Sequence, residues 1–178
     1  MSDLLVIGNY GGPVNPRDVD SEVNPLPGQS WKFFQEAAHE AGLDLDQAML
    51  VAAYPHPRVT QDPFTTEELK IARENLATIL SHIKTPRVIL VLGNDAMRAV
   101  LRKSGLGEKR GEEVEVQING ETVKVLPTYH PTNVINRPRN RPVWIKDLVR
   151  ARQLLYNEPM LDPTTGMVLV ERVTEDEL

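Results

Sequence analysis

The sequence contains no cysteine among its 178 residues. This absence excludes a disulfide-stabilised scaffold, a zinc site with cysteine ligands, an iron–sulfur cluster and a thiol nucleophile. The histidines do not compensate, because they are scattered along the chain rather than spaced like metal ligands. They are His39, His56, His82 and His130. We therefore expect no bound metal and no cofactor.

Long hydrophobic runs are also missing. No apolar stretch approaches the roughly 20 residues that cross a bilayer. The apolar run near the N-terminus is short and lacks the basic region of a signal peptide. These absences predict a soluble, cytoplasmic protein. Apolar residues make up 40% of the chain, which is enough to build one core at this length.

Acidic charge is concentrated at the C-terminal end. Residues 157–178 hold six acidic residues and one arginine, which accounts for the whole net charge of −5. We expect residues 1–156 to form one domain and residues 157–178 to be an acidic tail or linker. Within the domain lies a basic stripe whose only acid is Asp147. Its members are Arg137, Arg139, Arg141, Lys146, Arg150 and Arg152. Such a stripe either contacts a polyanion or forms a solvated helix face.

Strand and helix signals alternate along the domain. Short apolar runs and an Asn119-Gly120 hairpin signal predict strands at residues 4–8, 48–53, 87–92, 114–118 and 122–126. Amphipathic spacing and capping signals, including Thr65 with Glu68, predict helices at residues 30–41, 65–83, 94–102 and 142–156. The alternation predicts an α/β protein, a three-layer α/β/α sandwich around a central, mostly parallel four-stranded sheet.

Ligands of such sheets bind at the carboxyl ends of the strands. The loops at residues 9–12, 54–58 and 128–136 should therefore converge. The first contains GNYGG, which either cradles a phosphate or makes a tight turn; it lacks the third glycine of a dinucleotide fingerprint and the Lys-Ser/Thr of a P-loop. In the last, His130 precedes a proline in a polar loop and either faces the site or lies on the surface. His56 is assigned to a turn.

Four motifs occur in one order along the chain: GNYGG, PLPGQSWKFF, VILVLGNDAMRAVL and LPTYHPTNVINRP. In this combination the chain resembles the uracil-DNA glycosylase superfamily, and most of all its compact thermostable iron–sulfur class (family 4). The resemblance covers roughly residues 4–155. It implies an α/β/α sandwich that flips a base out of DNA and cuts its N-glycosidic bond with water, without a redox cofactor or a catalytic metal. The cluster cysteines of that class are absent here.

Residue by residue, the resemblance is partial. Gly8, Gly11 and Gly12 match the water-activating loop, where Asn9 replaces a glutamate. An amide can orient water but cannot take its proton, so Asp18 and Asp20 are alternative activators. Leu26 stands in place of a phenylalanine that stacks on the base, and Ala52 in place of an asparagine that reads it. His130 matches the histidine that stabilises the departing base.

The resemblance also implies a DNA-binding segment after His130. Val134 and Ile135 match a loop that wedges into the duplex, and we expect them to be exposed, unless the pair packs onto the core instead. Arg137, Arg139 and Arg141 would then meet phosphates without reading sequence. The predicted partner is DNA, and the predicted state is a monomer.

Three functions follow as hypotheses. The first is a DNA glycosylase in which Asn9 orients water, His130 stabilises the leaving base, and Tyr10, Leu26 and Ala52 line a pocket enlarged for a modified pyrimidine. The second is a DNA-binding module that kept the fold and lost the chemistry, attached to a replication or repair protein through its tail. The third is a nucleotide- or phosphate-binding enzyme that uses GNYGG.

Overall fold

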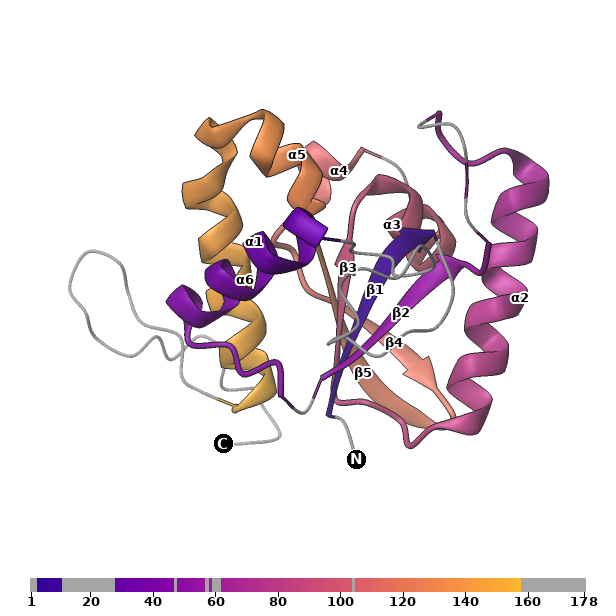
Figure 1. Ribbon diagram of the computed structural model, residues 1–178. Helices are drawn as coiled ribbons and strands as arrows, with labels where there is room; N and C mark the ends of the chain where they lie inside the picture. Colours follow the sequence, from indigo (N-terminus) through magenta and orange to yellow (C-terminus); the bar gives the residue numbers. More distant parts are fainter. Residues whose placement is uncertain are drawn as a thin grey trace.

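The computed structural model describes residues 3–10, 28–46, 48–56, 58, 62–103 and 105–157. Within these ranges a five-stranded sheet runs in the order β2-β1-β3-β5-β4 (Figure 1). The strands are β1 (Leu4–Tyr10), β2 (Met49–Tyr54), β3 (Val88–Leu92), β4 (Val114–Ile118) and β5 (Glu121–Thr128). All neighbouring pairs are parallel except β4 with β5. The predicted α/β class is therefore confirmed.

The sheet has five strands where four were predicted, because the hairpin adds β4 antiparallel to β5 at one edge. The hairpin turns at Asn119 and Gly120, whose φ angles are +53° and +79°. Positive φ at both central residues is the geometry that a two-residue hairpin requires, and asparagine and glycine tolerate it. The Asn-Gly signal thus marks the turn correctly.

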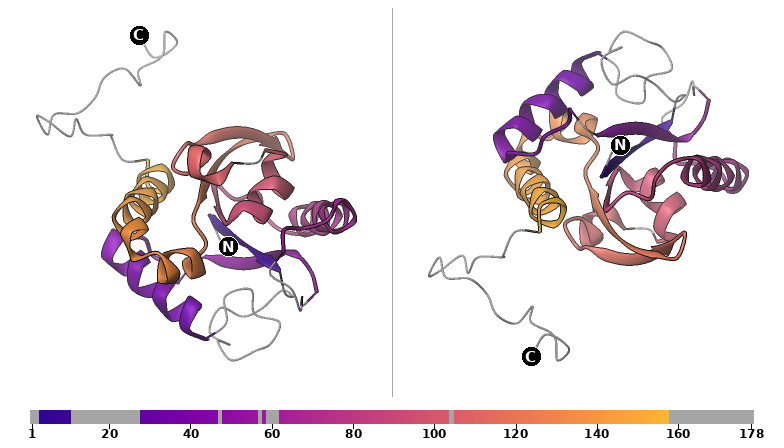
Figure 2. Two further views of the ribbon diagram at one scale, coloured as in Figure 1. Left: turned by 90° about the horizontal axis from the view of Figure 1, so that it is seen from above. Right: turned by 90° about the horizontal axis from the view of Figure 1, so that it is seen from below.

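Helices cover both faces of the sheet, which confirms the three-layer arrangement (Figures 1 and 2). On one face lie α1 (Gly28–Ala41), α5 (Pro131–Asn136) and α6 (Arg141–Leu155), and on the other lie α2 (Thr66–His82) and α3 (Asn94–Leu101). Two short elements, α4 (Leu106–Lys109) and the 3-10 helix η1 (Pro138–Asn140), complete the described chain. None of the helices in the described ranges combines the length and apolarity needed to cross a membrane.

The strands are apolar on both faces because helices bury both. In β1, Leu4 and Val6 join the core beneath α1 and α6, whereas Leu5 and Ile7 join the core beneath α2 and α3. Trp144 of α6 anchors the first core at 0% exposure, and its ring stacks on Phe33 of α1 at 5.4 Å between centroids. Aromatic pairs of this kind add about 0.5–1.5 kcal/mol beyond area burial.

Local end signals are confirmed in two helices. Thr65 caps α2, and the capping box with Glu68 is complete in both directions. Proline stands in the first turn of α6, where its missing N–H costs nothing. The segment at residues 128–136, predicted to be a polar loop, instead contains α5, which Pro131 opens at its first position. The proposed tail after residue 157 lies outside the described residues.

One carboxylate, Asp147 of α6, is buried at 2% exposure. Its oxygens accept hydrogen bonds from Arg110 Nε and Nη2, both at 2.8 Å, and from Thr128 Oγ1 at 2.6 Å. Gly111 lies against it, with a φ of +77°, and a Cβ there would stand 2.6 Å from Asp147 Oδ1. Since three hydrogen bonds hold that oxygen pair in place, it cannot move aside cheaply.

Comparing two glycine substitutions tests this contact. Gly120 has nearly the same φ, +79°, but open space where a Cβ would go. Gly120→Ala should therefore cost only the left-handed backbone term, about 1–2 kcal/mol. Gly111→Ala should cost about 1–3 kcal/mol more, since it also displaces a bonded carboxylate. Denaturant unfolding of both variants measures the difference, and equal losses would show that Asp147 is not held tightly.

Candidate active site at the carboxyl edge of the sheet

The carboxyl ends of four parallel strands meet at one edge, the upper edge in Figure 1. The predicted residues Asn9 and Tyr10 lie at the end of β1, Ala52 lies near the end of β2, and His130 follows β5. The register sets Gly8 opposite Ala52. Registered partners share a face, so these two small residues lie side by side near the edge. That face presents a hydrogen atom and a methyl group.

Asn9 is bonded to the start of α3. Its Oδ1 accepts a hydrogen bond from Ala96 N at 3.1 Å, and its side chain lies against Gly93. Gly93 is the N-cap residue of α3 and has no side chain to cap with. An oxygen from β1 therefore performs the capping task for the third helical N–H. This contact holds the Asn9 side chain with its Oδ1 directed at the N-terminus of α3.

Tyr10 belongs to an aromatic cluster around Arg58. The Arg58 guanidinium carbon is 5.8 Å from the centroid of the Tyr10 ring and 4.9 Å from that of Phe64. Its side chain is 5% exposed, and Nε and Nη2 donate to the Glu68 carboxylate at 2.8 and 3.0 Å. The Arg58 guanidinium therefore packs over the Tyr10 ring. The sequence carries no local signal of this role for Arg58, which stands as a lone arginine among prolines.

Ala52 is 2% exposed at the sheet edge. The Nδ2 atom of Asn75, in α2, donates to the carbonyl oxygens of Ala52 and Ala53, each at 3.0 Å. These bonds satisfy two carbonyl groups of the edge strand β2 and hold its carboxyl end in place. A second amide, Asn94 at the start of α3, has a buried Oδ1 without a hydrogen-bond partner in the described part of the chain. Such an acceptor is rare and can receive a ligand's donor.

His130 is the N-cap of α5, and its Nδ1 accepts a hydrogen bond from Thr132 N at 3.1 Å. A ring nitrogen that accepts carries no proton, so the neutral ring holds its proton on Nε2. Thr132 is also 3.3 Å from Ser30 at the start of α1, hydroxyl to hydroxyl. His130 is therefore half-buried in a defined tautomer, as an N–H donor at the carboxyl edge.

The prediction that Val134 and Ile135 are both exposed is wrong for Val134. It is 0% exposed and packs in the core beneath α1 and α6, because helix α5 turns its side chain inward. Ile135, the next residue, is half-buried. Asn133 is held as well, since its Oδ1 accepts from Asn140 Nδ2 at 2.9 Å. The alternative of packing onto the core therefore holds for Val134, and only Ile135 keeps partial exposure.

Much of the basic stripe is paired within the fold. Arg141 donates to Glu40 of α1, and this hydrogen bond raises the pKa of Arg141 and lowers that of Glu40. Arg150 pairs with Glu113, and Arg152 donates to Ala41 O. Arg137 and Arg139 are exposed, and no ion pair involves them within the described ranges. They are the two exposed arginines of the stripe.

Several predicted residues lie outside the described ranges, namely Gly11, Gly12, Asp18, Asp20 and Leu26. His56 is exposed, with its ring edge-on to Tyr54 at 5.5 Å, as its assignment to a turn allows. Among the described residues, no group of three or more histidine or acidic side chains is arranged to hold a metal ion.

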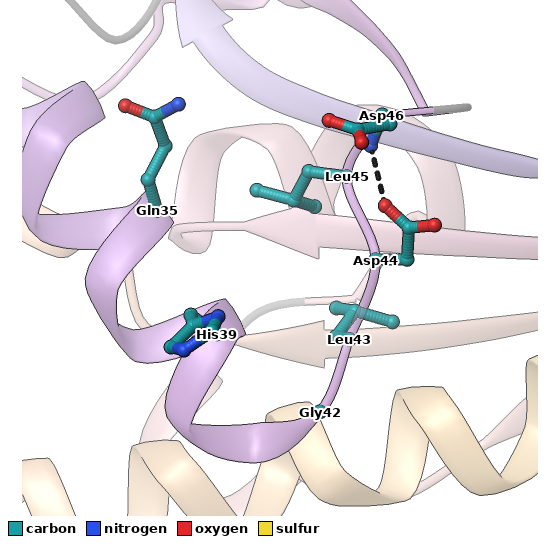
Figure 3. Close-up of a pocket in the computed structure, with 7 residues that line it drawn as sticks. All are labelled: Gln35, His39, Gly42, Leu43, Asp44, Leu45 and Asp46. Carbon is teal, nitrogen blue, oxygen red and sulfur yellow. Dashed lines mark hydrogen bonds between the residues drawn. The ribbon is translucent and has the colours of Figure 1, made fainter.

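A cavity of about 430 Å³ lies at the C-terminal end of α1, whereas Ser30 near His130 lies at its start (Figure 3). It is lined by Gln35, His39, Gly42, Leu43, Asp44, Leu45 and Asp46. These residues lie in the last turns of α1 and in the connection that leads into β2. The connection enters β2 at its amino end, so this cavity is separate from the site around His130.

The fold and the site define an α/β protein whose polar groups gather at the carboxyl edge around a capping histidine. The model of the family described as the uracil DNA glycosylase superfamily matches residues 10–152. The chain belongs to this superfamily. It is similar to two type-4 uracil-DNA glycosylases, from Archaeoglobus fulgidus (27% identity over 86% of this chain and 77% of that protein) and Saccharolobus solfataricus (24% identity, 89% and 74%). The resemblance inferred from the motifs is confirmed, and the chain is a distant member.

Substitution of Asn9 separates its capping role from other roles. Asn9→Ala should lower the free energy of unfolding by about 0.5–2 kcal/mol, the usual loss for a removed cap. Asn9→Asp should lose little, because a carboxylate oxygen accepts the same bond and is favoured at a helix N-terminus. Thermal and denaturant unfolding check both variants. Equal losses for Ala and Asp would contradict a capping role.

Proposed function

We propose that the protein is a DNA glycosylase that flips a base from DNA and hydrolyses its N-glycosidic bond. The single observation that carries the proposal is the hydrogen bond from Thr132 N to His130 Nδ1 at the carboxyl edge, which puts the proton of a neutral ring on Nε2. Family membership supports the reaction class, and the small side chains of Gly8 and Ala52 on the registered strands support a base site beside it.

In the proposed reaction, water adds to C1′ of the sugar while the bond from C1′ to the base nitrogen breaks. The electron pair of that bond stays on the base, and the sugar passes through an oxocarbenium-like state. His130 Nε2–H donates a hydrogen bond to the negative charge that builds on the base. The Asn9 amide donates to the water and positions it, and the proton that the water loses passes to solvent.

We propose that the preferred base is a modified pyrimidine rather than plain uracil. Ala52 cannot form the pair of hydrogen bonds that an amide side chain offers a base edge, which are worth about 1–3 kcal/mol of discrimination. Leu26 offers no ring for stacking, a loss of about 1–3 kcal/mol. Tyr10, over which the Arg58 guanidinium packs, would supply the aromatic wall instead.

DNA would be held by Arg137 and Arg139, whose exposed guanidinium groups are suited to phosphate contacts. Arg141 would have to give up Glu40 to join them. Ile135, rather than Val134, is the apolar side chain left to enter the stack. We propose further that residues 157–178 form an acidic segment separate from this domain, and that it contacts replication or repair proteins.

A second candidate is a DNA-binding module without catalysis. The Asn9 contact favours it, because the side chain that stands where a general base is expected is an amide whose oxygen already caps α3. Both candidates predict duplex binding, and only the first predicts abasic sites in DNA.

An abasic-site assay tests the proposal. Duplexes carrying uracil, a mismatched thymine, a hydroxymethyl pyrimidine or a deaminated purine are incubated with the protein. We expect slow or no cleavage of plain uracil and faster cleavage of a modified pyrimidine. Uracil excision that outpaces every other lesion would contradict the proposed preference, and the absence of abasic sites with all lesions would favour the binding module.

His130→Ala should lower whatever cleavage is found by about 10²–10³-fold, the usual loss for one preorganised donor to a developing anion. Duplex affinity should stay the same, because the ring stabilises the transition state rather than the bound duplex. Single-turnover rates and binding titrations measure the two quantities. A fully active variant would assign His130 to structure alone.

Salt dependence tests the DNA face. Replacing both Arg137 and Arg139 with Gln should weaken binding to any duplex. It should also flatten the plot of log affinity against log salt by roughly 0.9 per lost phosphate contact. Arg150→Gln is the matched control, since its charge is already paired with Glu113. An unchanged slope in the double variant would place the DNA face elsewhere.

A further inference from the structure

The structure assigns to Asp147 a positioning role for His130, through Thr128 and the end of β5. The inference rests on the proposed function, in which His130 stabilises the leaving base. Asp147 does not touch the base in this account. It acts by holding the strand end from which His130 projects.

The end of β5 is held at three consecutive residues. Pro127 O accepts from Gly111 N at 2.8 Å, and Thr128 O accepts from Gly93 N at 3.0 Å. Tyr129 O accepts from the indole Nε1 of Trp144 at 3.1 Å. The backbone leading to His130 is therefore tied to the α4–β4 connection, to the start of α3 and to α6.

Thr128 contributes the side-chain bond of this set. Its Oγ1 donates to Asp147 Oδ2 at 2.6 Å, and the residue is 0% exposed. Trp144 and Asp147 lie three positions apart on α6, so one face of one helix holds both Thr128 and Tyr129. His130 follows directly. Beyond it, the bonds from Thr132 N to Nδ1 and between Thr132 and Ser30 hold the ring from the other side.

Arg110 stabilises the buried carboxylate of Asp147. A buried carboxylate is stable only when it is paired and hydrogen-bonded, and Arg110 supplies two parallel bonds from the α4–β4 connection. The hydrogen bond to Asp147 in turn raises the pKa of the Arg110 guanidinium. Apolar residues would fill this space without an ion pair. What they would not supply is an acceptor aimed at Thr128, two residues before His130.

Substitutions of Thr128 separate the loss of its hydrogen bond to Asp147 from a general loss of stability. Thr128→Val removes the donor and nearly keeps the volume, whereas Thr128→Ser keeps the donor. Thr122→Val is the matched control, because it makes the same change at the exposed opposite end of β5. Asp147→Asn is a second disrupting variant, because it removes the charge that pairs with Arg110 and puts an amide NH₂ group in place of one of the two accepting oxygens. All are compared as full-length chains, below the unfolding transition of the least stable variant.

The first readout is the ring of His130 itself. Two-bond ¹H–¹⁵N NMR spectra distinguish protonated from unprotonated ring nitrogens, and the His130 signals are assigned by their loss in His130→Ala. We expect a proton on Nε2 in the wild type, Thr128→Ser and Thr122→Val. In Thr128→Val and Asp147→Asn, we expect both nitrogen signals to shift toward the average of the two tautomers.

The second readout is the single-turnover rate constant on the lesion that the protein cleaves best. Thr128→Val and Asp147→Asn should lower it about 10- to 100-fold with unchanged duplex affinity, since misplacement of a reacting group reduces rate rather than binding. Thr128→Ser should keep the rate. Wild-type spectra and rates in folded Thr128→Val would overturn the inference. If the wild type cleaves no lesion, the proposed function fails, and the spectra still decide the positioning of His130.

Discussion

A parallel sheet must bury both of its faces, and this constraint decides where the protein can place chemistry. The α1–α6 layer and the α2–α3 layer take up the apolar strands completely, so residues such as Leu90 and Val91 are inaccessible on either side. Polar side chains can then gather only at the strand ends. At the carboxyl edge, each of them is fixed by a helix rather than by its own strand: Asn9 by α3, Thr128 by α6 and His130 by α5.

The strands and most helix ends could be predicted because their signals are local. The run at β3, the Asn119-Gly120 turn and the Thr65–Glu68 box each lie within a few residues. The sequence does not predict helix α5, because its composition is polar and histidine is not a usual N-cap residue; only Pro131 at the first position points to a helix start. Its two buried residues, Pro131 and Val134, are too few to give the repeated apolar spacing that identifies longer helices. The error about the exposed pair follows from the missed helix.

The site itself was harder to predict because its contacts join distant parts of the chain. Asn9 caps a helix 87 positions away, and Arg141 pairs with Glu40 across 101 positions. No rule of residue spacing relates positions so far apart. The sequence therefore shows only a basic stripe, whereas in the structure Arg137 and Arg139 are exposed and the other arginines bind groups within the fold. Asp147 appears in the sequence only as the acid that interrupts that stripe. Its place beneath Thr128 depends on how α6 packs against β5.

These contacts also constrain how the reaction can proceed at position 9. Gly93 allows close approach, and a Cβ there would stand 2.9 Å from Asn9 Oδ1, so the amide and the glycine fit only as a pair. The amide oxygen of Asn9 accepts a hydrogen bond from the N-terminus of α3, and an amide is too weak a base to take a proton from water. In the proposed glycosylase reaction Asn9 therefore does not deprotonate the nucleophile, and stabilising charge on the departing base becomes the larger contribution of this edge. In that proposal the stabilisation depends on where the His130 Nε2–H points, so the bonds that fix the end of β5 would contribute to the reaction.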